Sequence, residues 1–205
     1  MYEVEAFREA RVEVMHGLIK THPLATLVTL TAQGLEANHI PMLIDPEPAP
    51  LGTLRGHVAR ANPIWRTFNA DVDVLAVFQG AQRYITPSWY PSKSQHGKVV
   101  PTWNYAVVHA HGPLRIIEDA EWLRKLVTRL TESQESQREQ PWHVTDAPGD
   151  YINTMLQAIV GFEIPIRRLQ GKWKMSQNRL PQDREGVINA LASQGDAATL
   201  DAMRR

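Results

Sequence analysis

The fold class of this chain is decided by one early stretch, Leu24-Ala-Thr-Leu-Val-Thr-Leu30, followed by Ala32-Gln33-Gly34 and by residues 35–44. The first run is apolar and rich in β-branched residues, which favours a strand. A short segment that ends in glycine is typical of a tight turn, so residues 35–44 are predicted to return as the second strand of a hairpin. Pro41 has no backbone N–H and indicates an edge strand or a bulge.

Further strands and helices are predicted on the C-terminal side of this hairpin, and one helix before it. Apolar or alternating runs predict strands at residues 52–58, 72–78, 83–85, 102–117 and 160–169, the fourth bent at Gly112-Pro113. Helical spacing predicts helices at residues 6–21, 62–69, 118–133, 150–159, 181–193 and 196–203. The strands do not alternate regularly with helices, and no G-x-G-x-x-G or Walker A sequence is present, which disfavours a Rossmann sheet. The prediction is an α+β fold, mainly antiparallel, built as a small barrel with peripheral helices.

The composition limits the class of protein. The 205 residues include 22 Lys+Arg and 22 Asp+Glu, so the formal net charge is zero, which argues against a strongly basic nucleic-acid-binding surface. Hydrophobic residues make up 43% and charged residues 21%, as expected of one globular domain with an appendage. The chain has no cysteine, which excludes disulfides, thiolate metal sites and cysteine nucleophiles.

The sequence also bears on location. The start, Met1-Tyr2-Glu3-Val4-Glu5, is acidic where a signal peptide is basic, and no run approaches the ~18 apolar residues of a membrane span. We expect a soluble, cytoplasmic protein without a membrane partner.

Two segments carry groups suited to a phosphorylated ligand. In Gly56-His-Val-Ala-Arg-Ala-Asn-Pro63, a strand end meets a helix start, where backbone N–H groups and Arg60 can hold a phosphate. The alternative is a plain helix cap beside a solvated arginine. Tyr84-Ile-Thr-Pro-Ser-Trp-Tyr-Pro-Ser-Lys93 offers hydroxyls, rings and a lysine, which suit a flat heteroaromatic ligand with a phosphate tail. Here the alternative is a rigid surface loop whose aromatic residues pack on the body of the protein.

Two later segments add polar and aromatic groups. Val100-Pro-Thr-Trp-Asn-Tyr-Ala106 enters a strand, and Asn104 can both donate and accept, as a pyrimidine-like edge requires. The alternative is that this segment is an ordinary strand with one face in the core. Cations and a tryptophan are interleaved in Gly171-Lys-Trp-Lys-Met-Ser-Gln-Asn-Arg179. Such a segment can bind nucleic acid, or it can close over a bound anionic cofactor. A simple loop at a subunit contact is the remaining alternative.

Other chemistry is weakly supported. His109-Ala-His111 has a metal-ligand spacing, but hydrogen-bonded or exposed histidines are the better interpretation, and no metal site is predicted. No G-x-S-x-G sequence supports a nucleophile. The two helices around Gly195 are acidic to neutral until Arg204-Arg205, which disfavours a DNA-recognition helix.

Taken together and in order, these segments resemble the PaiB-type family of FMN-binding negative transcriptional regulators. The residues that carry the resemblance are Met1-Tyr2 with Phe7, Asn38-His-Ile-Pro41, Gly56–Pro63, Tyr84–Tyr90 with Lys93, Val100–Tyr105 and Lys172–Arg179. The resemblance implies a split β-barrel like that of pyridoxine-phosphate oxidases, with FMN at the interface of a homodimer. It would place the FMN-binding domain at residues 1–180 and a C-terminal helical extension at residues 181–205.

The resemblance also implies which residues bind FMN. Grouped by expected contact, they are Arg60 and Asn62 for the phosphate; Thr86, Ser88 and Lys93 as second candidates for phosphate or ribityl oxygens; Thr102, Trp103 and Asn104, with Trp89 nearby, for the ring system; and Lys174, Ser176 and Gln177 from the C-terminal part, of the same subunit or of its dimer partner.

Two functions follow as alternatives. The first is a flavin-binding protein that senses or performs redox chemistry on a small molecule, and so a possible flavin-dependent oxidoreductase. The second is a transcriptional repressor that binds DNA or a protein partner, with FMN as a ligand only or absent.

Overall fold

The structure is a computed structural model that describes residues 1–204. Of the predicted helical extension, only Arg205 lies outside the described residues. The chain divides into two compact units. The first comprises residues 1–18, 79–109 and the chain from Gln170 onward, and the second comprises residues 19–78 and 110–169.

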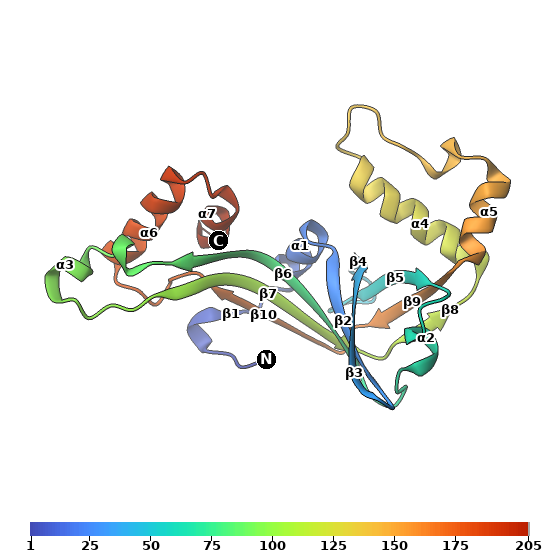
Figure 1. Ribbon diagram of the computed structural model, residues 1–205, viewed down its shortest axis with the longest axis horizontal. Coiled ribbons are helices and arrows are strands. Elements are labelled where there is room, and N and C mark those ends of the chain that lie inside the picture. Colours follow the sequence, from blue (N-terminus) through green and yellow to red (C-terminus); the bar gives the residue numbers. More distant parts are fainter. Residues whose placement is uncertain (205) are drawn as a thin grey trace. The chain divides into compact units, whose positions relative to one another are not determined.

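The first unit contains an antiparallel sheet with short helices at its strand ends and a helical C-terminus (Figure 1). Its strands are neighbours in the order β1-β10-β7-β6, and Arg8 of β1 lies opposite Lys172 of β10. Its elements are η1 (Glu5–Phe7), β1 (Arg8–Glu9), the start of α1 (Val12–Thr21), the later part of β6 (Val74–Ile85), η2 (Pro87–Trp89), α3 (Ser92–His96), the start of β7 (Thr102–Gly112), most of β10 (Arg168–Lys174), α6 (Pro181–Ser193) and α7 (Ala197–Arg204).

The second unit holds the hairpin and a separate four-stranded sheet. The start of β6 pairs with β2, which pairs with β3, and the other sheet has the order β4-β5-β9-β8. The pairs β2–β3, β2–β6, β4–β5, β5–β9 and β8–β9 are antiparallel. The elements are β2 (Leu24–Thr31), β3 (Gly34–Pro41), β4 (Leu43–Asp45), β5 (Thr53–Ala59), α2 (Ile64–Thr67), β8 (Arg115–Ile117), α4 (Ala120–Glu135), η3 (Val144–Asp146), α5 (Gly149–Gln157) and β9 (Ile159–Pro165).

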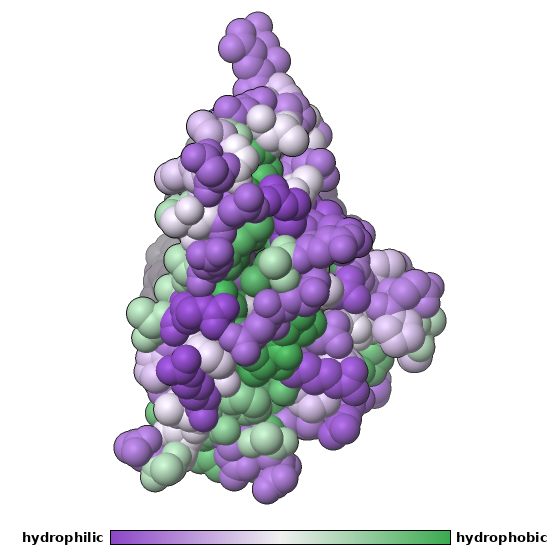
Figure 2. All heavy atoms as spheres, turned by 90° about the vertical axis from the view of Figure 1, so that its right-hand side faces the viewer, coloured by the Kyte–Doolittle hydropathy of each residue, from purple (hydrophilic) through white to green (hydrophobic). Residues whose placement is uncertain are grey.

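Helix α4 packs on α5, η3 and β5 within the second unit. A hydrophobic cluster joins these elements and contains Leu123, Val144, Ile152 and Leu156. The side of the molecule that carries α4 and α5 is turned to the viewer in Figure 2, where hydrophobic side chains gather between hydrophilic ones. This is the pattern of amphipathic helices that bury one stripe and keep the other face in water.

The predicted fold class is confirmed. The predicted hairpin forms, with Leu30 opposite Leu35, and the predicted bend separates β7 from β8. A Cβ on Gly112 would lie 2.1 Å from the carbonyl oxygen of Pro165, so this bend requires glycine. No helix in residues 1–204 is long and apolar enough to cross a membrane.

Several element boundaries were predicted wrongly. The first helix begins at Val12 and not at residue 6, because Arg8–Glu9 pair with β10 as a short strand. The strands predicted at 72–78 and 83–85 are one strand, β6. The segment after residue 170, which was not predicted as a strand, continues as β10 up to Lys174. Pairing with distant strands extends each of these segments, and sequence periodicity cannot report such pairing.

Candidate functional site

The best-formed group of predicted residues lies in the first unit, where β7 begins and β10 ends. Asn104 is fully buried, and its Oδ1 accepts a hydrogen bond of 2.9 Å from Ser176 Oγ. Its Nδ2 points to Met203 Sδ at 3.7 Å. Ser176 has a φ of 61°, a left-handed conformation that is uncommon for a residue with a side chain. The buried amide therefore holds the turn after β10 against β7.

Lys174 reaches across to the same strand. Its ammonium group donates to Thr102 Oγ1 and, at 2.6 Å, to the carbonyl oxygen of Trp103. Burial lowers the pKa of Lys174, and the positive charges of Arg179 and Lys172 lower it further. Both hydrogen-bond acceptors are neutral oxygens, so this position concentrates positive charge and favours a bound anion.

Gln177 closes the turn that follows Lys174. Its side-chain oxygen accepts from the backbone N–H of Met175 at 2.6 Å, and its amide nitrogen donates to the carbonyl oxygen of Trp173. These two local hydrogen bonds explain how Gln177 supports the position of its neighbours.

Trp103 offers an aromatic surface beside this group. Its side chain points away from the buried face of β7 and is 53% exposed. Tyr84, at the end of β6, meets it edge-to-face, with ring centroids 5.9 Å apart. The predicted alternation on β7 is therefore confirmed, because Asn104 faces inward and the tryptophan outward.

The predicted residues of the 84–97 segment form a second group in the same unit. This segment contains η2 and α3, where no helix was predicted. Thr86 Oγ1 accepts from the backbone N–H of Ser88 at 3.3 Å, and Lys93 Nζ donates to Ser88 Oγ at 3.4 Å. The backbone of Trp89 lies close against α6. A Cβ added to Gly186 of α6 would lie 2.1 Å from the carbonyl oxygen of Trp89.

Two residues that were not predicted hold this segment in place. Asp183 in α6 is buried and accepts from the backbone N–H of Ser92 at 3.1 Å and from its hydroxyl at 2.7 Å. Arg179 lies over the ring of Tyr90, 5.0 Å from its centroid. Burial raises the pKa of Tyr90. An acid in the first turn of a helix suggests only a favourable dipole contact, so no sequence signal indicated the buried role of Asp183.

Arg60 lies in the second unit, at the end of β5. Its guanidinium donates to the carbonyl oxygens of Gln157, at 2.8 Å, and Ile159, at 3.1 Å, and pairs with Glu118 at 2.5 Å. These contacts tie the end of β5 to the junction of α5 and β9. Its role toward a phosphate stays a prediction.

Asn62 follows in the same unit, two residues before α2. Its Oδ1 accepts from the backbone N–H of Ile64 at 3.0 Å, and its Nδ2 donates to Asn38 Oδ1. The N-cap position itself is held by Pro63, which corrects the prediction of a cap at Asn62. Helix α2 is only four residues long, shorter than predicted. Among the described residues, no group of three or more His, Asp or Glu residues is placed to hold a metal ion.

The residues present fit FMN by their chemistry. A planar isoalloxazine ring needs apolar surface such as the exposed Trp103, and the phosphate or an electron-rich ring edge needs cations such as Lys174. The first unit therefore brings ten of the predicted residues into two groups: Thr102, Trp103, Asn104, Lys174, Ser176 and Gln177; and Thr86, Ser88, Trp89 and Lys93.

Comparison with known proteins identifies relatives along nearly the whole chain. A protein of Emericella nidulans without an assigned function is 35% identical over 233 aligned positions, which cover 97% of this chain and 93% of the relative. The protease synthase and sporulation protein PAI 2 of Bacillus subtilis is 34% identical over 195 positions, which cover 95% of this chain and 90% of the relative.

Solved structures show the same fold at low sequence identity. The conserved hypothetical protein Rv2991 of Mycobacterium tuberculosis has a TM-score of 0.60 at 15% identity, covering 88% of this chain and 94% of that one. The flavocytochrome Anf3 of Azotobacter vinelandii has a TM-score of 0.60 at 10% identity, covering 84% of this chain and 72% of that one. The protein family described as "Putative FMN-binding domain" matches residues 1–168. The match spans most of the sequence, so this chain belongs to that FMN-binding family, and its cofactor is FMN.

Proposed function

We propose that the chain binds FMN beside the ends of β7 and β10 and uses it to sense or perform redox chemistry on a small molecule. The observation that carries the proposal is Lys174, a partly buried cation that donates hydrogen bonds to two neutral oxygens and whose pKa is lowered by burial and by two neighbouring cations. A bound anion would offset that repulsion. When bound, FMN would supply one- and two-electron transfer, and the chain has no thiol for redox chemistry of its own.

Each group of residues has a part in this proposal. Trp103 supplies a surface for the ring, and Lys174 with Thr102 supplies polar contacts at its edge. Asn104 and Ser176 are satisfied by each other, so they position the turn and hold the lysine in place. As the family resemblance implies, either Arg60 with Asn62 or Lys93 with Thr86 and Ser88 supplies the phosphate contact.

We also propose a homodimer with FMN at its interface. Tyr84, Val100 and Trp103 are large hydrophobic side chains of the first unit that remain exposed, and a ring or a second subunit would remove them from water. Light scattering on a size-exclusion column tests this, since a monomer that nevertheless binds FMN would contradict it. The absence of cysteine suits a reducing cytoplasm.

The FMN site is tested by titrating cofactor-free protein with FMN and following the quenching of flavin fluorescence. Lys174→Met is expected to weaken FMN binding by about 10- to 100-fold, since a hydrogen bond to a charged group is worth about 1.5–3 kcal/mol. Lys20→Met, at an exposed lysine, is the control and should bind as the wild type does. Wild-type affinity in Lys174→Met would place the anion elsewhere, and wild-type protein that never binds FMN would contradict the proposal.

The same titration tests the predicted phosphate contact. Arg60→Ala is expected to weaken FMN binding by about 1.5–3 kcal/mol if the guanidinium holds the phosphate. Glu118→Gln removes the ion pair and leaves the arginine, so it separates loss of the local tie from loss of an FMN contact. Unchanged affinity in Arg60→Ala would favour the group around Lys93.

The regulator interpretation remains an alternative prediction, because the Bacillus subtilis relative is named for protease synthesis and sporulation. A steep, salt-dependent band shift with promoter DNA that random DNA does not reproduce would favour direct regulation.

A further inference from the structure

A hollow of about 360 Å³ lies in the first unit and is lined by residues of β1, β10, α6 and α7 and of the segments beside them. Trp173, Met175 and Met203 belong to its lining and are otherwise buried, so part of its wall is apolar. The volume falls in the range of about 300–1,000 Å³ that is usual for small-molecule sites. An apolar wall also keeps water away from neighbouring charges, which strengthens their attraction for an ion of opposite sign.

The hollow is separate from the group of residues around Lys174. Side chains alternate along β10, so Trp173 lies on the opposite face of the strand from Lys174. Of the residues proposed for FMN, only Gln177 lines the hollow, and both ends of its side-chain amide already bond to Met175 and Trp173. A ligand in the hollow would therefore not compete for Lys174.

The charged groups of the lining are mainly arginines. They are Arg8, Glu9, Arg11, Arg184 and Arg204. Glu5 is not part of the lining but lies 3.9 Å from Arg8, so it belongs to the same charge balance. Four arginines against two carboxylates leave two positive charges in excess. The complete chain has a formal net charge of zero, so this excess is local.

One of the four arginines is already paired. Arg11 donates from Nε to Glu9 Oε1 at 2.8 Å and from a terminal nitrogen to Glu9 Oε2 at 2.6 Å. These hydrogen bonds lower the pKa of Glu9, so its carboxylate is ionised and neutralises this arginine.

The other three arginines keep donors for a further partner. Arg184 donates from one terminal nitrogen to the carbonyl oxygen of Met203, which is a neutral acceptor. Arg8 lies beyond hydrogen-bonding distance of Glu5, and both side chains are mostly exposed, which makes a weak ion pair. Among residues 1–204, no carboxylate pairs with Arg184 or with Arg204. Each guanidinium has five N–H donors, so these three can bind an additional oxygen anion.

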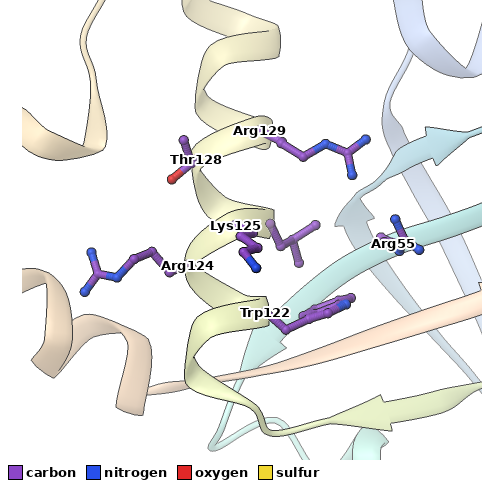
Figure 3. A pocket seen from close by; sticks show the side chains of 7 residues that line it. Arg55, Trp122, Arg124, Lys125, Thr128 and Arg129 are labelled. Carbon is purple, nitrogen blue, oxygen red and sulfur yellow. The ribbon is translucent and has the colours of Figure 1, made fainter.

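A larger hollow in the second unit shows the contrast. It has about 580 Å³ and lies between α4 and β5, where Figure 3 shows Arg129 extending toward the strand that carries Arg55. Both arginines pair with Asp45, and Lys125 pairs with Glu121. Carboxylates of the protein itself thus neutralise these cations, whereas Arg184 and Arg204 in the first unit have no such partner in the described chain.

We propose that the hollow of the first unit binds a phosphate monoester other than FMN. Near neutral pH such an ester carries a charge of about −1.5 to −2, which matches the excess of two positive charges. Its three terminal oxygens accept hydrogen bonds, and a guanidinium binds them through two parallel N–H donors. The phosphate would bind Arg8 and Arg184, which come from β1 and α6. The organic part of the ligand would contact the apolar wall that contains Trp173 and Met203.

The test is a phosphorus NMR titration of the full FMN-loaded chain with methyl phosphate, at about pH 8, where this ester is a dianion. Dimethyl phosphate differs by one methyl group, carries a single negative charge and is the matched probe. We expect saturable binding of methyl phosphate and at least about tenfold weaker binding of dimethyl phosphate, since a charge-assisted hydrogen bond is lost. Equal affinity for the two probes, or no saturable binding of methyl phosphate, would overturn the proposal.

Variants locate the binding in the hollow. Arg184→Gln is expected to weaken binding of methyl phosphate at least about tenfold, and Arg8→Gln about threefold, because the Arg8 side chain is 54% exposed to water. Arg8 lies on an edge strand, so Arg8→Gln keeps the test decisive if Arg184→Gln unfolds. Arg138→Gln, at an exposed arginine of the second unit, is the control and should bind as the wild type does. Wild-type affinity in both Arg8→Gln and Arg184→Gln would contradict the assignment to this hollow.

A second arm separates this ligand from the phosphate of FMN itself. Cofactor-free and FMN-loaded protein should bind methyl phosphate equally, and FMN affinity should be unchanged in Arg8→Gln and Arg184→Gln. Loss of methyl phosphate binding on loading with FMN, or a parallel loss of FMN in the variants, would assign the hollow to the cofactor and refute a second ligand. The titration of cofactor-free protein gives its result whether or not the chain binds FMN where proposed.

Discussion

Single side chains in this protein serve purposes that their residue types alone do not reveal. Asn104 was predicted to read the edge of a pyrimidine-like ring, and a plain core position was the alternative. In the structure it is fully buried, with its oxygen bonded to Ser176 and its nitrogen near Met203. A buried amide is retained when its hydrogen-bonding groups find partners, which gives Asn104 a positioning role next to Lys174.

His57 predicts a measurable dependence of stability on pH. Burial lowers the pKa of His57, and its Nδ1 has no hydrogen-bond partner among residues 1–204. The unfolded chain therefore binds a proton more readily than the folded one, so stability falls as the pH drops below about 6.5, the ordinary value for histidine. We expect the thermal midpoint of cofactor-free His57→Gln to fall less between about pH 7.5 and pH 5.5 than that of the wild type.

The exposed His22 provides the control for this measurement. His22→Gln should keep the wild-type slope of thermal midpoint against pH, because folding leaves this imidazole in contact with water. If His57→Gln also keeps the wild-type slope, burial of His57 does not contribute to acid sensitivity.

At the scale of elements, α4 shows how closely a local pattern can specify a helix. The predicted apolar stripe contributes Leu123 and Leu126 to the buried residues. Asp119 precedes the helix in an extended conformation, and its carboxylate accepts from the backbone N–H of Trp122 at 2.7 Å. Such a cap satisfies one of the donors that the first turn leaves without a partner.

This cap predicts the cost of its removal. Asp119→Ala is expected to lower the free energy of unfolding by about 1 kcal/mol, as measured by urea denaturation. Asp119→Asn should lose much less, because asparagine caps helices about as well as aspartate. An equal loss in both variants would show that the negative charge, and not the cap, stabilises this end of α4.

At the scale of the whole molecule, FMN binding should appear as added thermal stability. A ligand that binds only the folded state at about 100 times its dissociation constant adds about 2.7 kcal/mol. For a chain of this size, that corresponds to a rise in thermal midpoint of about 5–10 °C. Differential scanning calorimetry with increasing FMN measures it, and riboflavin, which lacks the phosphate, should give a smaller rise. An unchanged midpoint at saturating FMN would contradict binding to the folded chain.

Much of the fold was predictable because its determinants are local. The hairpin of β2 and β3 follows from an apolar run, a glycine turn and a matching return strand, and α6 begins at Pro181 as predicted. The error at the first helix has the opposite origin, since Arg8–Glu9 form a strand only because β10 lies beside them. The order of the blocks along the chain was also enough to recognise the FMN-binding family.

The sequence by itself determined most of the strands and helices, the absence of thiol chemistry and the family, because propensity, periodicity and residue type act over a few neighbouring positions. Only the tertiary structure decided that Lys174 meets Thr102 and that Ser176 meets Asn104, each pair 72 residues apart. It also decided that Arg60 bonds the end of α5, and that Arg55 and Arg129 share Asp45. Such contacts depend on which strands become neighbours, and the free energy that selects those neighbours comes from burial and pairing summed over an entire unit.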